Sequence, residues 1–233
     1  MKKRIVIDTS TGGLDYYPHN HGIDILRIKI LINNKEFEDG LTLKAEEFYD
    51  MLKSDKNLLP KTSQPSVGEV SELFQKYLND GVEDIFVVTI SSKMSGTYQS
   101  CVLASKEFEN RLNIKVFDSK TVCFSEGVFA LEAKRMMDEG MSLDEIEQNL
   151  NQMISKNTIF FAVNSLTYLV KNGRLSNAKG YIGKLLNLKP ILQVQEIGEI
   201  VAIENKRTIK SALESITTKV KSYVKGKPYK AYL

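Results

Sequence analysis

Two clusters of serine and threonine residues hold the side chains that could do chemistry in this sequence. The first is residues 62–66, with the sequence TSQPS, and the second is residues 91–98, SSKMSGTY, directly after the apolar run at 85–90. Where a strand passes through such a turn into a helix, the N-terminus of the helix carries unpaired backbone N–H groups and a partial positive charge. The hydroxyls add further donors, and Gly96 lets the backbone approach a ligand closely. The clusters therefore predict an anion-binding site.

Motifs that would carry catalysis on such an anion do not accompany the clusters. No GxGxxG follows a strand, no GxSxG surrounds a serine, and GYIGKL at 180–185 shares only its Gly-Lys pair with a phosphate loop. His19 and His21 lie in one polar loop without other ligand types beside them. We therefore expect no cofactor and no metal. A hydrolase or phosphotransfer enzyme that uses Ser95 on a small acid is the alternative to a binding protein.

Composition and charge are those of an ordinary soluble globular protein. The 233 residues are 42% hydrophobic and 26% charged, with a net charge of +3 that comes from scattered lysines. No basic block predicts nucleic-acid binding, and no apolar segment approaches the ~18 residues of a membrane span. Asp8 interrupts the N-terminal apolar run too early for a signal peptide. Cys101 and Cys123 form no CxxC pair, so we expect a cytoplasmic protein.

The first part of the chain alternates strands and helices, which predicts a parallel sheet with helices on its faces. Ser66 and Glu69 form a capping box, and Gly81 follows the end of that helix. The expected strands are 4–8, 23–32, 85–90 and 114–118, and the expected helices are 42–53, 66–80, 97–110 and 119–139.

The pattern changes after Gly140. A second capping box at Ser142 starts a helix to about residue 156, and a strand at 158–163 follows. Two strands at 191–194 and 199–204 flank Gly198, which predicts an antiparallel hairpin. The expected fold class is α/β with two domains. Residues 1–160 form an N-terminal parallel-sheet domain that carries the hydroxyl site, and residues 161–233 form a smaller α/β domain.

Taken together, these segments resemble the DegV proteins, which are bacterial fatty-acid-binding proteins. The resemblance runs from Lys3 to about Ala212 and depends on several motifs in a fixed order. The matching segments are 7–10 (IDTS), 62–66 (TSQPS), 91–100 (SSKMSGTYQS), 118–119 (DS), 166–169 (LTYL), 172–175 (NGRL) and 188–192 (LKPIL), with Gly198.

The resemblance implies a carrier and not an enzyme acting alone. A long-chain fatty acid would lie in a tunnel between the two domains, with its carboxylate held by Thr62 and Ser95 and by the backbone at Gly96. A separate fatty-acid kinase would then convert the presented acid to an acyl phosphate. Four more residues are possible parts of the ligand pocket: Asp8, Ser63, Met94 and Thr97.

One departure from the family concerns the C-terminal part. Members of the family run on past the position of Leu233, with a closing strand and a histidine that assists at the carboxylate. Neither His19 nor His21 matches that histidine. We therefore expect a second domain that is incomplete relative to the family and a carboxylate end that is less enclosed.

Overall fold

The computed structural model describes residues 2–175 and 188–232. It divides into two compact units, Met1–Lys156 and Asn157–Leu233. The domain boundary expected after residue 160 falls inside a strand of the second unit, β8 (Ile159–Ala162). The Gly-Lys segment at 180–185 lies outside the described residues.

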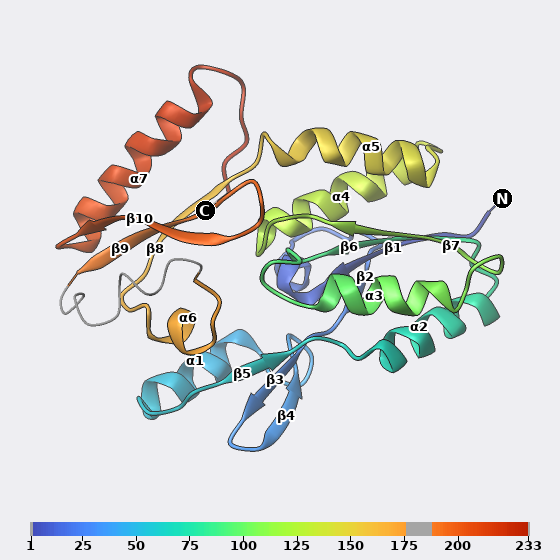
Figure 1. Cartoon of the computed structure of the whole chain (residues 1–233), viewed down its shortest axis with the longest axis horizontal. Helices are drawn as coiled ribbons and strands as arrows, with labels where there is room; N and C mark the ends of the chain where they lie inside the picture. The colour runs from blue at the N-terminus through green and yellow to red at the C-terminus, as the bar shows by residue number, and fades with distance from the viewer. Residues whose placement is uncertain (1, 176–187, 233) are drawn as a thin grey trace. The chain divides into compact units, whose positions relative to one another are not determined.

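The first unit is built on a four-stranded parallel sheet in the order β2-β1-β6-β7 (Figure 1). Its strands are β1 (Arg4–Thr9), β2 (Asp24–Leu26), β6 (Asp84–Thr89) and β7 (Asn113–Asp118). The strand order reverses between β1 and β6. In open α/β sheets ligands bind beyond the carboxyl ends of the strands at such a reversal.

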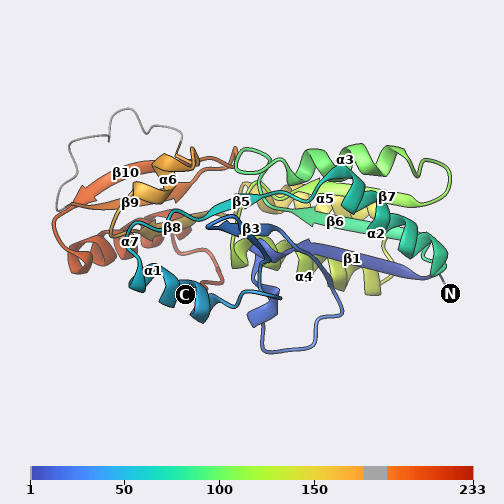
Figure 2. The same cartoon turned by 90° about the horizontal axis from the view of Figure 1, so that it is seen from below.

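Helices cover both faces of this sheet, as Figures 1 and 2 show. They are α2 (Val67–Asn79), α3 (Thr97–Lys106), α4 (Phe124–Asp138) and α5 (Leu143–Ile154). Successive strand residues point to opposite faces. Accordingly, Val6 and Phe86 pack into one core with residues of α4 and α5, whereas Ile7 and Val87 pack into another with residues of α2 and α3. The near-continuous apolar strands of the sequence are thus buried on both sides.

A small antiparallel sheet in the order β4-β3-β5 and helix α1 (Ala45–Ser54) complete the first unit. The strands are β3 (Lys29–Ile32), β4 (Lys35–Glu38) and β5 (Lys61–Ser63). The single strand expected at 23–32 is therefore two strands, β2 and β3, in different sheets. Strand β5 was not expected from the sequence, and it contains the first two hydroxyls of the TSQPS motif.

The second unit contains an antiparallel sheet in the order β10-β9-β8, with β9 (Lys189–Val194) and β10 (Ile200–Lys206). Helix α7 (Ile209–Val224) packs against its strands, and α6 (Thr167–Lys171) is a short separate helix. Gly198 turns the chain between β9 and β10 with a φ of +89°, a conformation that favours glycine. The expected antiparallel hairpin and the α/β fold class are confirmed.

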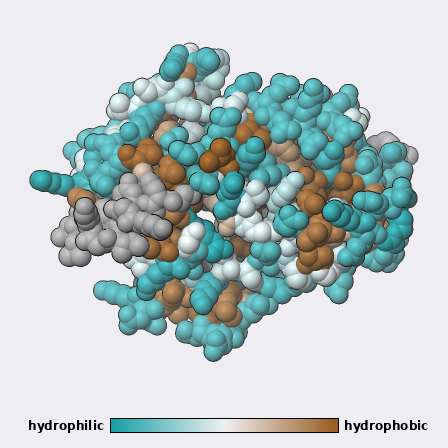
Figure 3. All heavy atoms as spheres, viewed as in Figure 1, coloured by the Kyte–Doolittle hydropathy of each residue, from teal (hydrophilic) through white to brown (hydrophobic). Residues whose placement is uncertain are grey.

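The surface is mixed in character. Figure 3 shows polar residues over most of the visible face, with apolar patches among them. Within the described residues, no helix is both long enough and apolar enough to cross a bilayer.

Candidate functional site

The SSKMSGTY segment leaves the carboxyl end of β6 and folds into a tight turn before α3. Ser91 fixes this turn, because its carbonyl oxygen accepts from the amides of Met94 and Ser95 at 2.9 and 3.1 Å. The Ser91 hydroxyl also accepts from the amide of Lys93. Met94, a possible pocket residue, is half-buried in this turn. The expected strand-turn-helix arrangement around Ser95 is present.

Asp118, at the carboxyl end of the neighbouring strand β7, holds the same turn from the side. Its carboxylate accepts from both the amide and the hydroxyl of Ser92, at 3.0 and 2.5 Å, and from the amide of Lys120 at 3.0 Å. Hydrogen bonds to a charged carboxylate are stronger than those between neutral groups. Asp118, the first residue of the Asp-Ser pair, therefore holds the turn at Ser92 in place.

The residue at the N-cap position of α3 has no side chain that could cap the helix. Gly96 occupies the N-cap position. By contrast, α2, α5 and α7 each begin with a serine or threonine hydroxyl that accepts from the amide three residues later. The Ser95 hydroxyl lies 2.9 Å from that of Thr97 and accepts from the Thr97 amide at 3.3 Å. The start of α3 thus presents backbone N–H groups and the half-buried hydroxyl of Ser95, which suit an anion. Thr97 is buried, and its amide already donates to Ser95.

The recorded hydrogen bonds of Ser95 offer no support for a catalytic serine. Its hydroxyl partners are the hydroxyl and the amide of Thr97. A serine nucleophile needs a general base within hydrogen-bonding reach. In the part of the chain that the structure describes, no histidine or carboxylate is hydrogen-bonded to Ser95.

In the TSQPS motif, two hydroxyls are exposed and one caps a helix. Thr62 lies in β5, where its backbone pairs with Ile30 of β3. Among the described residues, the hydroxyls of Thr62 and Ser63 have no hydrogen-bond partner, and both residues are exposed. Ser66 accepts from the amide of Glu69 at 3.2 Å, while the Glu69 carboxylate accepts from the amide of Ser66. The capping box expected there is confirmed.

Gln64 brings the two hydroxyl motifs together. Its carboxamide lies over Gly96, where a Cβ atom would approach the Gln64 Nε2 atom to 2.5 Å. The same nitrogen donates to the hydroxyl of Ser100 in α3 at 3.2 Å. A side chain of the TSQPS motif therefore lies over Gly96, and the role of Gly96 in ligand binding stays a prediction. That motif and the N-terminus of α3 lie side by side.

Asp8 belongs to a separate buried cluster at the end of β1. Neither of its carboxylate oxygens has a hydrogen-bond partner among the residues that the structure describes. The Glu126 carboxylate of α4 adjoins it and accepts from the hydroxyls of Thr9 and Thr11. Burial and the neighbouring negative charge raise the pKa of Glu126, and burial raises that of Asp8. Sequence analysis did not predict a role for Glu126. Asp8, a possible pocket residue, is enclosed by protein groups, and Gly12 packs directly against it.

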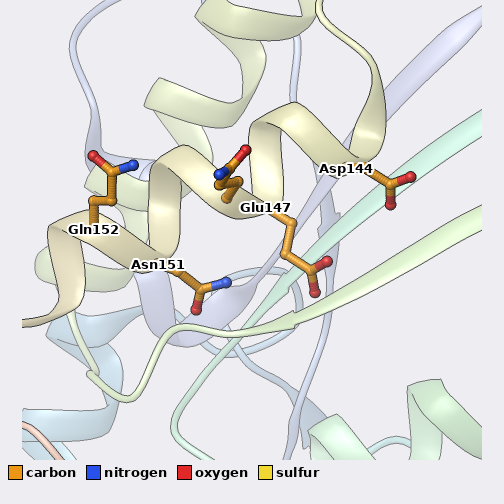
Figure 4. Close-up of a pocket in the computed structure, with 5 residues that line it drawn as sticks. Asp144, Glu147, Asn151 and Gln152 are labelled. Atoms are coloured by element: carbon orange, nitrogen blue, oxygen red, sulfur yellow. The ribbon is translucent and has the colours of Figure 1, made fainter.

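A hollow of about 500 Å³ on the surface of α5 lies apart from both motifs. Figure 4 shows that the side chains lining it spread along this helix. They are Asp144, Glu147, Gln148, Asn151 and Gln152. Its two carboxylates bind Lys115 of β7, at 2.8 and 3.0 Å. An acidic surface hollow does not suit a carboxylate ligand. Within the described residues, no cluster of three or more His, Cys, Asp or Glu could hold a metal ion.

The chain matches a known protein family in sequence. A family model described as an uncharacterised protein of the DegV family matches residues 2–233. A DegV domain-containing protein of Clostridium acetobutylicum is 33% identical over 219 residues, which cover 92% of this chain and 77% of the relative.

Solved structures resemble the whole fold. A fatty acid binding DegV family protein from Streptococcus agalactiae superposes with a TM-score of 0.84 and 32% identity, covering 97% of this chain and 80% of that one. A stearic acid-binding protein from Eubacterium ventriosum gives a TM-score of 0.82 with 26% identity, covering 97% and 77%. The chain therefore belongs to the DegV family.

Proposed function

We propose that this protein binds a long-chain fatty acid and holds its carboxylate at the N-terminus of α3. The observation that carries the proposal is the meeting of the TSQPS motif with the start of α3, where Gln64 lies on Gly96 at the N-cap position. The description of solved relatives as fatty acid binding supports the choice of ligand.

The proposed head-group site combines two kinds of hydrogen-bond donor with a partial positive charge. Ser95 and Thr62 supply hydroxyls, and the first turn of α3 supplies backbone amides and a partial positive charge. The Thr62 hydroxyl has no partner among the described residues, so a ligand can accept its hydrogen bond without breaking another. Each hydrogen bond to a carboxylate contributes about 1.5–3 kcal/mol.

The acyl chain would supply most of the affinity. Burying about 14 methylenes at ~0.8 kcal/mol each gives ~11 kcal/mol before the costs of association, which remove several kcal/mol. The tail thus provides affinity, and the hydroxyls orient the head group. The tunnel between the two domains that would enclose the tail stays a prediction of the family resemblance.

We also propose that the bound acid is presented to a separate kinase, which forms the acyl phosphate. The hydroxyl site fits such a role because its hydrogen-bond donors would orient a carboxylate. Among the described residues, no general base is hydrogen-bonded to Ser95. The kinase would supply the nucleotide and the metal ion.

Mass spectrometry of an organic extract of the purified protein tests the ligand directly. We expect a fatty acid of about C16–C18 in near-stoichiometric amount and no turnover of ester or phosphate substrates. An extract without fatty acid, together with ester or phosphate hydrolysis that Ser95→Ala abolishes, would contradict the proposal and favour a serine-dependent enzyme.

A further inference from the structure

The Gln64 carboxamide packs directly on Gly96. The backbone of Gly96 has φ −79° and ψ 7°, which residues with side chains also adopt. This conformation therefore does not require glycine at position 96. A Cβ atom would lie 2.5 Å from Gln64 Nε2 and 2.6 Å from its Cδ, closer than nonbonded atoms approach. A side chain at position 96 would therefore have to displace the Gln64 carboxamide, which is the end of an exposed side chain.

The chain on both sides of Gln64 is held in place. Before it, β5 pairs with β3 through Thr62 and Ile30. After it, Pro65 is buried and restricts Gln64 to extended backbone. Further on, the Ser66–Glu69 capping box begins α2, and Lys29 of β3 forms an ion pair with Glu69. The Gln64 side chain thus extends from a fixed support toward α3.

We propose that Gln64 is a positioning residue for the fatty-acid carboxylate, because it fixes the segment that carries Thr62 against the N-terminus of α3. The inference rests on the proposed function. Gln64 acts through its hydrogen bond to Ser100 and its packing on Gly96, and Thr62 and Ser95 make the contacts with the ligand. Without the carboxamide, the two hydroxyl motifs lose the side chain that sets their spacing.

The first test compares an acid with an alcohol of the same chain length. Palmitate and 1-hexadecanol share the tail, and palmitate alone has the carboxylate. We expect Gln64→Ala to weaken palmitate binding about tenfold, the loss of roughly one well-placed hydrogen bond to a charged group. Hexadecanol binding should change less than threefold. Gln64→Glu should weaken palmitate binding further, since it adds a like charge at the anion site.

Gln75→Ala is the matched control. Gln75 lies on α2 and donates to Asn79 within the same helix at 2.9 Å, away from both motifs. If wild type binds palmitate and the two Gln64 variants bind it as tightly as Gln75→Ala does, the positioning role is wrong and the proposed function stands. If Gln64→Ala weakens palmitate and hexadecanol equally, the residue supports the fold or the tail pocket and does not position the head group. If wild type binds no palmitate, both proposals fail.

A double-mutant cycle tests the contact itself without any ligand. Gly96→Ala should lower the melting temperature of the wild-type protein, because its methyl group displaces the carboxamide. In the Gln64→Ala background the same change should cost clearly less, since the space is then free. Equal costs in both backgrounds would show that Gln64 does not occupy the space above Gly96, and would overturn the inference.

Discussion

Replacing Glu126 by glutamine should stabilise the protein increasingly as the pH rises. The Glu126 carboxyl is fully buried beside Asp8, whose own carboxylate oxygens have no hydrogen-bond partner within residues 2–175 and 188–232. Burial and the negative charge of Asp8 raise the pKa of Glu126, so the folded state favours the protonated form. A proton on Glu126 also supplies a donor to Asp8. Glutamine keeps the shape of protonated glutamate, can donate to Asp8, and does not ionise.

The sign follows from proton linkage. Below the ordinary pKa of glutamate, about 4.3, the folded and unfolded chains are both protonated and the raised pKa has no effect. Above it, the unfolded chain releases its proton while the folded chain keeps it. The free energy of unfolding therefore falls as the pH rises, until the folded group also ionises. Each unit by which the pKa is raised removes about 1.4 kcal/mol.

Urea unfolding between pH 5 and pH 8 measures this effect. The free energy of unfolding of Glu126→Gln minus that of wild type should increase with pH, whereas Glu109→Gln, a change at an exposed position, should give a flat difference. Glu126→Ala should instead destabilise the protein by about 1–3 kcal/mol for each hydroxyl, of Thr9 and Thr11, that it leaves without its buried partner. If the free energies of unfolding of wild type and Glu126→Gln changed with pH in parallel, the raised pKa of Glu126 would be refuted.

Three further predictions concern single side chains. Asp118→Asn should free the turn at Ser92 and weaken palmitate binding severalfold with little change in melting temperature; an unchanged dissociation constant would contradict a role for this carboxylate at the site. Ser66→Ala should lower the free energy of unfolding by about 1 kcal/mol through loss of its bond with Glu69, and urea unfolding would show no change if the cap were unimportant. Burial raises the pKa of the Cys101 thiol to about 12, so iodoacetamide should label Cys101 at pH 8 only after denaturation. Rapid labelling of Cys101 in the folded protein would show that the thiol is accessible.

Local sequence signals predicted the elements that depend on nearby residues. The capping boxes at Ser66 and Ser142 and the hairpin around Gly198 each need only a few consecutive residues. The parallel sheet followed from the alternation of apolar strands and helices. The hydroxyl-rich turn before α3 followed from the same pattern, since a strand, a turn and a helix occur in direct succession.

Features that depend on distant residues could not be predicted in this way. Glu126 reads as an ordinary acidic residue in the first turn of a helix, and only the fold brings it from 117 positions away to Thr9. Gln64 stands among four smaller polar or turn residues, and its contact with Gly96 requires β5 and α3 to be neighbours. The split of 23–32 into two strands is likewise decided by pairing with β1 and with β4 and β5.

A fatty-acid titration combined with a coupled kinase assay tests the central claim most directly. Wild type and the Thr62→Ala/Ser95→Ala double variant would be compared, with Ser105→Ala, a change on α3 away from the N-terminus, as the control. The account predicts that the double variant still binds palmitate, because the tail contribution remains, with affinity reduced at least tenfold. Acyl phosphate formation should fall further than affinity, since it depends on the placement of the carboxylate. A double variant that binds palmitate and supports phosphorylation like wild type would show that Thr62 and Ser95 do not hold the head group.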